Sequence, residues 1–581
     1  MRSIKHLLNH QISACMRTCT GISDSDANVI TASRPEFGDY QANGVMRLAK
    51  QLKINPRELA NQVIEELNNH KKNIVERYEL AGPGFINIFL LNEEILKRAN
   101  RITNKEVPLV PKSEKRLKIT VDYSSPNLAK EMHVGHLRGT IIGDAIVRIL
   151  EKKGHKVIRQ NHVGDWGTQF GMLICYMKEL QNSTTEDLPA ALSDLEKFYQ
   201  VAKERFDIDD EFAVNSRKEV VHLQSGNKNS IRIWEQFINE SLDHCDEIYA
   251  QLNVTLTRSH LDAESKYNDA LPGIISQLES RGLLSESEGA KCVFLPQFLG
   301  KDGDSLPVIV QKSDGGYLYS TTDLAAIAYK CEELDIDRAL YVVDARQSLH
   351  FQQVFAVAKR ANLASDKISL EHIAYGTMMD SSGKPFKTRS GGTTKLIELL
   401  DESVSRAYAL VTEKNPELGK KERLKIAKKV GIGSVKYADL SKNRTSDYIF
   451  DWSTMLSFEG NTAPYLMYAF ARIKSILAKA SGDKRYTRIT ILESSEERLL
   501  LIKLLQFPEI VDSVALDCFP NQLCNYLHEL AGLFMRFYEA CPILKAENEE
   551  IMESRLALCD LTARVISTGL ELLGIQSPEM M

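Results

Sequence analysis

The sequence DYSSPNLAKEMHVGHLRGT, residues 122–140, places an acidic residue, an asparagine, a lysine and two histidines in one loop between a predicted strand and a predicted helix. Residues 117–121 alternate apolar and polar side chains, as strands do, and residues 140–150 have the apolar spacing of a helix that ends near Gly154. A second strand over residues 155–161 leads into the glycine-rich turn VGDWG, residues 163–167. This order predicts a βαβ crossover unit, whose ligands bind beyond the carboxyl ends of the strands.

His133 and His136 lie at the predicted start of the helix, where unpaired backbone N–H groups and the helix dipole favour an anion. A phosphate suits such a place, because Gly135 lets a nucleotide approach the backbone and imidazole N–H groups donate to a phosphoryl oxygen as its charge grows. The alternative is that both histidines are ordinary loop residues with structural or solvent hydrogen bonds. The short pattern H-x-G-H alone does not decide between these interpretations.

These residues resemble the HIGH signature of class I aminoacyl-tRNA synthetases, and the longer string SPNLAKEMHVGHLRGT is similar to the arginyl-tRNA synthetase form of it. The resemblance covers essentially the whole chain, because further strings match that family in order: GPGFIN (82–87), VGDWGTQFG (163–171), KPFKTR (384–389), DLSKNR (439–444), FEGNTAPY (458–465) and LGIQSPEMM (573–581). So many ordered matches make coincidence a poor explanation. By this resemblance the HIGH region comprises Pro126, Asn127, Leu128, Ala129, Lys130, Glu131, Met132, His133, Val134, Gly135 and His136.

The resemblance also implies where ATP binds. It assigns catalytic roles to Lys130, His133, His136, Lys384 and Lys387, and ATP contacts to Lys130, His133, Gly135, His136, Gly376, Met378 and Met379. The family's usual Lys-Met-Ser-Lys-Ser loop corresponds to KPFKT, residues 384–388, in which Pro385 and Phe386 depart from the pattern. That departure puts in doubt whether the loop is mobile and how much it contributes to catalysis. We therefore expect Lys130 to be catalytic; the alternative is a solvent-exposed loop lysine.

A cationic guanidinium substrate requires carboxylates, which its planar fork of donors pairs with bidentately. Asp122 closes the first predicted strand, and Asp323 lies in a predicted helix after another. By the resemblance, Asp122 and Asn127 bind the α-amino end of arginine, and Tyr319, Asp323 and Gln347 bind the remainder, with Asp323 on the guanidinium. Some family members carry glutamate in place of Asp122. The alternative for Asp323 is an acid that only stabilises a helix N-terminus.

The chain is expected to be α/β, with several domains. We predict an N-terminal α/β module over residues 1–110, a Rossmann-like catalytic domain with a parallel sheet over 111–400, a helical connector over 401–455 and an all-α helical bundle over 456–581. A helical insertion over residues 184–284 interrupts the sheet, which resumes with strands at 316–320, 338–344 and 372–376. Within the bundle, Leu523, Leu527, Leu530, Phe534 and Phe537 follow helical spacing and predict a core stripe.

Composition and motif content argue against several other classes of protein. No apolar run approaches the roughly 20 residues that span a bilayer, so we expect no membrane segment. The start of the chain lacks the apolar core of a secretory signal, so we expect a cytoplasmic protein. We also expect a monomer. Ten cysteines without a C-x-x-C pair predict no zinc site. No P-loop and no G-x-G-x-x-G occurs, which argues against P-loop kinases and dinucleotide dehydrogenases. The net charge of −5 does not suggest nucleic-acid binding, so any RNA surface is local. The basic runs at 420–429 and 474–488 are candidates, or solvated helix faces.

The resemblance predicts an arginine–tRNA ligase that uses ATP, with Mg²⁺ on its phosphates, and passes through arginyl-adenylate. Its partners are L-arginine, ATP and tRNA(Arg), with the N-terminal module at the tRNA outer corner, the bundle at the anticodon, and Asn87 and Met581 as tRNA contacts. The alternative for Asn87 is packing inside a strand. Two other functions stay open: a ligase or nucleotidyltransferase with another substrate, and a non-catalytic RNA-binding relative. Arginine-dependent ATP–pyrophosphate exchange separates them.

Overall fold

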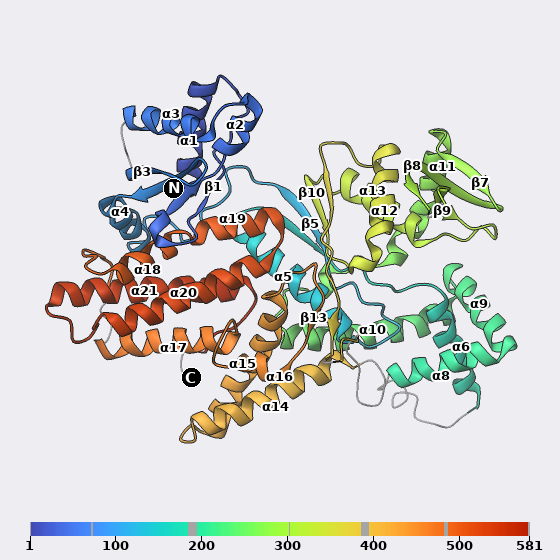
Figure 1. Ribbon diagram of the computed structural model, residues 1–581. Coiled ribbons are helices and arrows are strands. Elements are labelled where there is room, and N and C mark those ends of the chain that lie inside the picture. Colours follow the sequence, from blue (N-terminus) through green and yellow to red (C-terminus); the bar gives the residue numbers. More distant parts are fainter. Residues whose placement is uncertain are drawn as a thin grey trace. The chain divides into compact units, whose positions relative to one another are not determined.

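The computed structural model describes residues 2–70, 74–183, 195–300, 302–380, 382–384, 394–480 and 486–578 (Figure 1). It divides into two compact units. One comprises residues 1–112, 458–571 and 577–581, and the other residues 113–457 and 572–576. The second of these units contains the HIGH region.

A four-stranded parallel sheet forms the centre of this second unit, as the sequence predicts. Its strands are β5 (Lys118–Asp122), β6 (Lys156–Gln160), β10 (Arg338–Tyr341) and β11 (Ser369–His372), in the order β11-β10-β5-β6. The chain moves from β5 to β6 on one side and later returns to β10 on the other side. The carboxyl ends of β5 and β10 therefore form a topological switch point, where open α/β sheets bind ligands.

Helices that follow these strands carry the side chains of the switch point. They are α5 (Gly135–Lys152), α12 (Tyr319–Glu332) and α13 (Ser348–Arg360). Most of α5 is buried, including the polar Thr140 and Asp144, so this helix is a core element of the unit. The apolar faces of α12 and α13 share one hydrophobic cluster with α11 and β10.

Two of the predicted strands are wrong. Residues 316–320 form no strand, because only Tyr317 pairs, as an isolated bridge with Gln311, and Tyr319 already opens α12. The strand predicted at 372–376 ends at its first residue, because β11 covers Ser369–His372. Apolar runs this short do not distinguish a strand from the first turn of a helix. The strand predicted at 338–344 is confirmed over Arg338–Tyr341.

The insertion is helical as predicted, but an antiparallel meander follows it that the sequence reading missed. Its described helices are α8 (Leu195–Ile208), α9 (Asp210–Gln224), α10 (Lys228–Gln251) and α11 (Leu271–Ser280), and α6 (Thr168–Ser183) precedes it. The meander comprises β7 (Leu284–Ser287), β8 (Ala290–Leu299) and β9 (Ser305–Gln311). Beyond the sheet come α14 (Leu396–Lys414), α15 (Lys420–Leu440) and α16 (Trp452–Met455), together with the short parallel pair β12 (Met378–Met379) and β13 (Tyr448–Ile449).

The first unit combines an antiparallel sheet with a helical bundle. The N-terminal elements are α1 (Ile4–Thr20), β1 (Val29–Thr31), β2 (Tyr40–Ala42), α2 (Val45–Leu52), α3 (Pro56–Asn69), β3 (Val75–Ala81), β4 (Phe85–Leu90) and α4 (Asn92–Thr103), with strand order β1-β2-β4-β3. The C-terminal helices are α17 (Ala463–Ala480), α18 (Ser495–Leu505), α19 (Phe507–Asp517), α20 (Pro520–Ala540) and α21 (Glu549–Leu572). The predicted stripe on α20 is fully buried, which confirms it as core.

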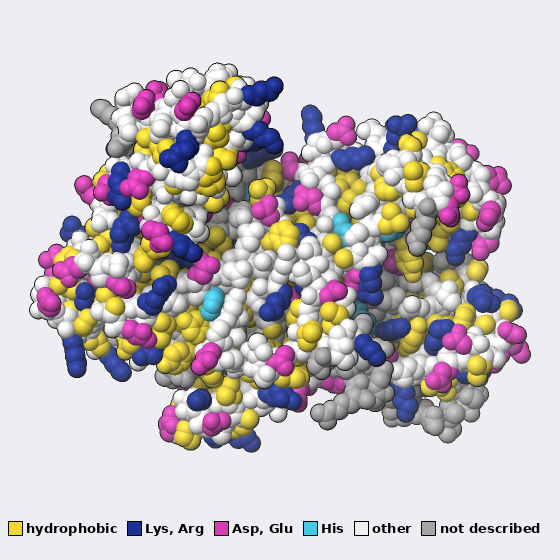
Figure 2. Space-filling model, viewed as in Figure 1, with side chains coloured by type: hydrophobic (Ala, Val, Ile, Leu, Met, Phe, Trp, Pro, Cys, Tyr) yellow, Lys and Arg dark blue, Asp and Glu magenta, His cyan; other side chains and the backbone are white. Residues whose placement is uncertain are grey.

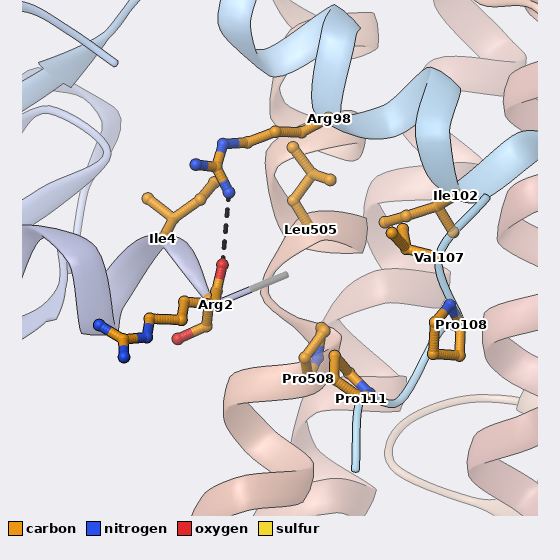
Figure 3. Close-up of a pocket in the computed structure, with 10 residues that line it drawn as sticks. Arg2, Ile4, Arg98, Ile102, Val107, Pro108, Pro111, Leu505 and Pro508 are labelled. Carbon is orange, nitrogen blue, oxygen red and sulfur yellow. Dashed lines mark hydrogen bonds between the residues drawn. The ribbon is translucent and has the colours of Figure 1, made fainter. Parts of the chain in front are cut away.

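The N-terminal module and the bundle pack into one compact unit. Arg498 of α18 binds the carboxylate of Asp39 at 2.7 Å, and the Tyr40 hydroxyl donates to the buried Glu509 at 3.1 Å. Figure 3 shows a small apolar cleft in the same unit, where Val107, Pro108 and Pro111 lie beside Leu505 and Pro508. The segment of residues 107–111 therefore packs against the bundle. The domain boundaries near 110 and 456 stay predictions.

Two surface properties bear on partners. No helix among the described ranges is long and apolar enough to cross a membrane. On the face drawn in Figure 2, lysine and arginine side chains are interspersed with acidic ones, in keeping with the small net charge of −5.

Candidate active site

A cavity of about 830 Å³ opens at the carboxyl ends of β5 and β10. It is lined by eleven of the residues predicted from the sequence: Asp122, Asn127, His133, Val134, Gly135, His136, Tyr319, Asp323, Gln347, Gly376 and Met378. Lys130, Met379 and Lys384 lie outside that lining, and Lys387 and Met581 fall outside the described residues. Residues separated by more than 250 positions in the chain thus meet at the switch point of the sheet.

Backbone N–H groups orient the two histidines. The backbone N–H of His133 donates to Nδ1 of His136 at 3.0 Å, and that of Gly135 donates to Nδ1 of His133 at 3.1 Å. A ring nitrogen that accepts a hydrogen bond carries no proton, so each neutral imidazole carries its N–H on Nε2. A Cβ at position 135 would approach Cε1 of His133 to 2.8 Å, which explains the glycine. The two ring centroids lie 4.0 Å apart.

Both imidazoles are kept neutral. Burial, followed by the neighbouring His133, lowers the pKa of His136 to about 3. Burial also lowers the pKa of His133, and the positive charges of Lys130 and Arg346 lower it further. At neutral pH the histidines therefore act as hydrogen-bond donors at the N-terminus of α5, and the positive charge near them comes from Lys130 and Arg346.

Acidic side chains also line the cavity. Asp323, on α12, contacts Nε2 of His350 through Oδ2 at 2.6 Å. Glu264 lines the same cavity, and burial raises the pKa of its carboxyl group to about 7. Sequence reasoning missed Glu264, because it begins a short 3-10 helix, Glu264–Ala270, and belongs to no motif that we used. A side-chain hydroxyl, that of Tyr319, is also available here and is largely exposed.

Asp122 is already paired. Its Oδ2 accepts a hydrogen bond from the buried Lys330 at 3.2 Å, and its Oδ1 accepts one from the Ser125 hydroxyl at 2.9 Å. His162 is a second cation that sequence reasoning missed. Burial lowers the pKa of His162, but the contact with Asp262 and the charges of Asp122 and Asp323 outweigh burial and raise it to about 9. Lys330 and His162 thus offset part of the negative charge that Asp122, Asp262 and Asp323 bring together.

Gly376 and Met378, which the resemblance assigns to ATP, line a part of the cavity at the start of β12. The Gly376 N–H donates to the carbonyl of Arg444 at 2.8 Å, and the Thr377 N–H donates to Asp447 at 2.6 Å. A Cβ at Gly376 would meet Asp447 Oδ1 at 2.6 Å. Arg138 of α5 lies in the same region, 2.9 Å from the buried Asp439. The string DLSKNR, residues 439–444, therefore supports the strip of backbone that lines this part.

The two described lysines with predicted catalytic roles differ in their surroundings. Nζ of Lys130 lies 4.2 Å from the centroid of the Tyr199 ring, and its positive charge lowers the pKa of His133 and of His136. Lys384 is exposed, in a turn where its N–H donates to Asp380 at 3.2 Å.

In the first unit, Asn87 is only 4% exposed, and its Oδ1 accepts from Gln41 at 2.7 Å. Its contact with tRNA stays a prediction.

No group of three His, Cys, Asp or Glu side chains among the described residues is arranged to hold a metal ion. The residues present thus do not form a protein cage for Mg²⁺. An ion that accompanies ATP would take its ligands mainly from the phosphates and water, as Mg²⁺ often does.

Comparison with known proteins agrees with this geometry. Residues 99–452 match the model for the catalytic domain of class I (R) tRNA synthetases, residues 466–581 the DALR anticodon binding domain, and residues 2–90 the arginyl tRNA synthetase N terminal domain. The chain is 53% identical to the arginine–tRNA ligase of Laribacter hongkongensis and 52% identical to that of Chromobacterium violaceum, each over 100% of both chains.

Solved structures give the same result. The arginyl-tRNA synthetase of Plasmodium falciparum superposes with a TM-score of 0.86 at 29% identity, and that of Thermus thermophilus with a TM-score of 0.83 at 26% identity. Each comparison covers 100% of both chains. The predicted fold class is therefore confirmed, and the chain belongs to the arginyl-tRNA synthetase family.

Proposed function

We infer that this protein ligates L-arginine to its cognate tRNA at the expense of ATP, through arginyl-adenylate, with release of pyrophosphate and AMP. One observation carries the proposal: a single cavity has neutral imidazole donors at the N-terminus of α5 on one side and the carboxylates of Asp323 and Glu264 on the other. The first side suits a phosphate group and the second a guanidinium ion.

In the first step, a carboxylate oxygen of arginine attacks the α-phosphorus of ATP. The bond from this phosphorus to the bridging oxygen of the β-phosphate breaks, and pyrophosphate leaves. His133 and His136 donate from Nε2 to the phosphoryl oxygens, whose negative charge grows in the transition state. Lys130, Lys384 and Lys387 offset the charge of the leaving pyrophosphate, and Mg²⁺ accompanies the phosphates. Gly135, Gly376, Met378 and Met379 provide the ATP contacts.

In the second step, a terminal ribose hydroxyl of tRNA attacks the arginyl carbonyl carbon, and AMP leaves. No covalent enzyme intermediate is required. The protein acts by positioning the reactants and by stabilising charge.

Arginine is held at its two ends. Asp323 and Glu264 pair with the guanidinium, with Tyr319 and Gln347 beside it, and Asn127 and Asp122 serve the α-amino end. Since Lys330 and Ser125 already donate to Asp122, the contribution of Asp122 to binding is smaller than that of an unpaired carboxylate. Lysine offers a point charge rather than a planar fork, so paired carboxylates favour arginine over lysine by geometry.

The matched domains suggest how tRNA(Arg) binds. The C-terminal bundle is proposed to contact the anticodon, and the N-terminal module the outer corner, with Asn87 and Met581 among the contacts. We further propose that the protein is a cytoplasmic monomer.

ATP–pyrophosphate exchange tests the function. We expect exchange that depends on arginine, is not supported by lysine at equal concentration, and is greatest with tRNA(Arg) present. The absence of exchange with and without tRNA would contradict the enzyme assignment. Exchange with another amino acid alone would point to a different ligase.

A further inference from the structure

The helical insertion supplies an aromatic side chain to the proposed catalytic lysine. Nζ of Lys130 lies 4.2 Å from the centroid of the Tyr199 ring, and Tyr199 belongs to α8. A lysine ammonium within about 6 Å of a ring centroid is attracted by the negative face of the ring. The insertion is therefore linked by a direct contact to the HIGH region.

The Tyr199 ring is a fixed partner. Its side chain is buried, at 7% exposure, on the face of α8 that packs into the insertion. The adjacent Phe198 packs against Phe237 at 5.3 Å and against Tyr176 at 4.8 Å between ring centroids, so this turn of α8 is anchored in an aromatic cluster. Because the ring is largely withdrawn from water, its attraction for the ammonium is less weakened by solvent.

The flexible side chain of Lys130 requires a fixed partner if its ammonium is to be held in one place. Its ammonium ends a flexible four-carbon stem that loses rotamer freedom whenever the charge is held in one place. The charge lies close enough to His133 and His136 to lower the pKa of both imidazoles. The ring occupies one side of the ammonium and leaves its other N–H donors free of the ring, and Lys130 lies three residues before His133, which lines the cavity.

We propose that Tyr199 is a positioning residue that holds the Lys130 ammonium beside the phosphate-binding end of the cavity. This inference depends on the proposed function, because it assumes that Lys130 acts on the phosphates. It assigns the insertion a part in adenylate formation.

The contact is tested by substitution at position 199 in the full-length protein. Tyr199→Leu keeps an apolar side chain but removes the ring, and we expect it to lower kcat of arginine-dependent ATP–pyrophosphate exchange, with tRNA(Arg) present, about fivefold to tenfold. The KM for arginine should change less than twofold. Tyr199→Phe keeps the ring face and should stay within twofold of the unchanged protein. Tyr176→Leu is the matched control: it disturbs the same aromatic cluster away from Lys130, and should also stay within twofold.

A double-mutant cycle with Lys130→Ala separates positioning from general packing. If Tyr199 acts through Lys130, Tyr199→Leu has no further effect on kcat once Lys130 is alanine. An equal loss in both backgrounds would overturn the inference, because the ring would then act independently of the lysine, and so would an equal loss in Tyr176→Leu. Lys130→Ala with an unchanged rate would instead show that the proposed role of Lys130 is wrong. The two failures are therefore distinguishable.

Discussion

The two ends of the active-site cavity handle charge in opposite ways. At the phosphate end, burial keeps His133 and His136 neutral, so they act as dipolar donors at a helix N-terminus. At the arginine end, carboxylates gather around two buried cations, Lys330 and His162. A neutral donor adds little to the binding of the ground state, whereas a fixed carboxylate binds a permanent cation throughout the reaction. The phosphate end should therefore govern turnover, and the arginine end substrate affinity.

The largest effect is expected at the phosphate end. His136→Ala removes an Nε2–H donor that strengthens as charge develops on the phosphoryl group, so kcat of ATP–pyrophosphate exchange should fall about 100-fold to 1,000-fold. The KM for arginine should change little. Steady-state exchange kinetics measure both. His222→Ala, on the exposed side of α9, is the control and should leave kcat unchanged. An unchanged rate in His136→Ala would reject its role in the transition state.

At the arginine end the balance should be reversed. Asp323→Asn replaces a carboxylate with a neutral amide, so the KM for arginine should rise about 100-fold, while the KM for ATP stays within a fewfold. Initial rates over an arginine titration at fixed ATP give the values. Asp304→Asn, in the exposed turn between β8 and β9, is a charge-matched control. If arginine affinity survives in Asp323→Asn, another side chain is the main partner of the guanidinium.

The phosphate end was more accessible to sequence reasoning than the arginine end, for a physical reason. His133, Gly135 and His136 lie within a single turn, so a short string that resembles the HIGH signature indicates all three together. Likewise the stripe on α20 follows from periodicity, because one helix face must be buried. Short strands such as β11 were misplaced, since a few apolar residues carry no clear period.

The arginine end depends on long-range packing. Lys330 reaches Asp122 across 208 positions of sequence, and the pKa of His162 depends on Asp262 and Asp323. Glu264 lies in a segment without a motif, and burial within the cavity, followed by the charges of Asp165 and Asp323, raises the pKa of its carboxyl group. Neither pairing nor desolvation is visible in local sequence, so these three residues emerge only from the structure.

Glu264 makes the arginine end sensitive to pH. Its pKa is raised by burial to about 7, so the carboxylate form that attracts guanidinium predominates only above that pH. The KM for arginine should therefore fall about tenfold between pH 6 and pH 8, as the ionised fraction of one such group rises about tenfold. Glu264→Gln should abolish this pH dependence and keep the KM near the value seen at pH 6. A KM that varies with pH equally in the variant would assign the titration to another group.

The phosphate end should show no such dependence. The pKa of His136 lies near 3, so this imidazole gains no proton as the pH falls from 8 to 6.5, and burial lowers the pKa of His133, so His133 gains less than an ordinary histidine would. With arginine and ATP saturating, kcat of exchange should change less than twofold between pH 6.5 and pH 8, even though the KM for arginine varies. The contrary result would be a kcat that falls with a single ionisation near pH 7 in the unchanged protein but not in His133→Asn. That result would show that His133 titrates in this range. Measuring kcat and the KM for arginine over the same pH series thus tests the contrast between the two ends in a single protein.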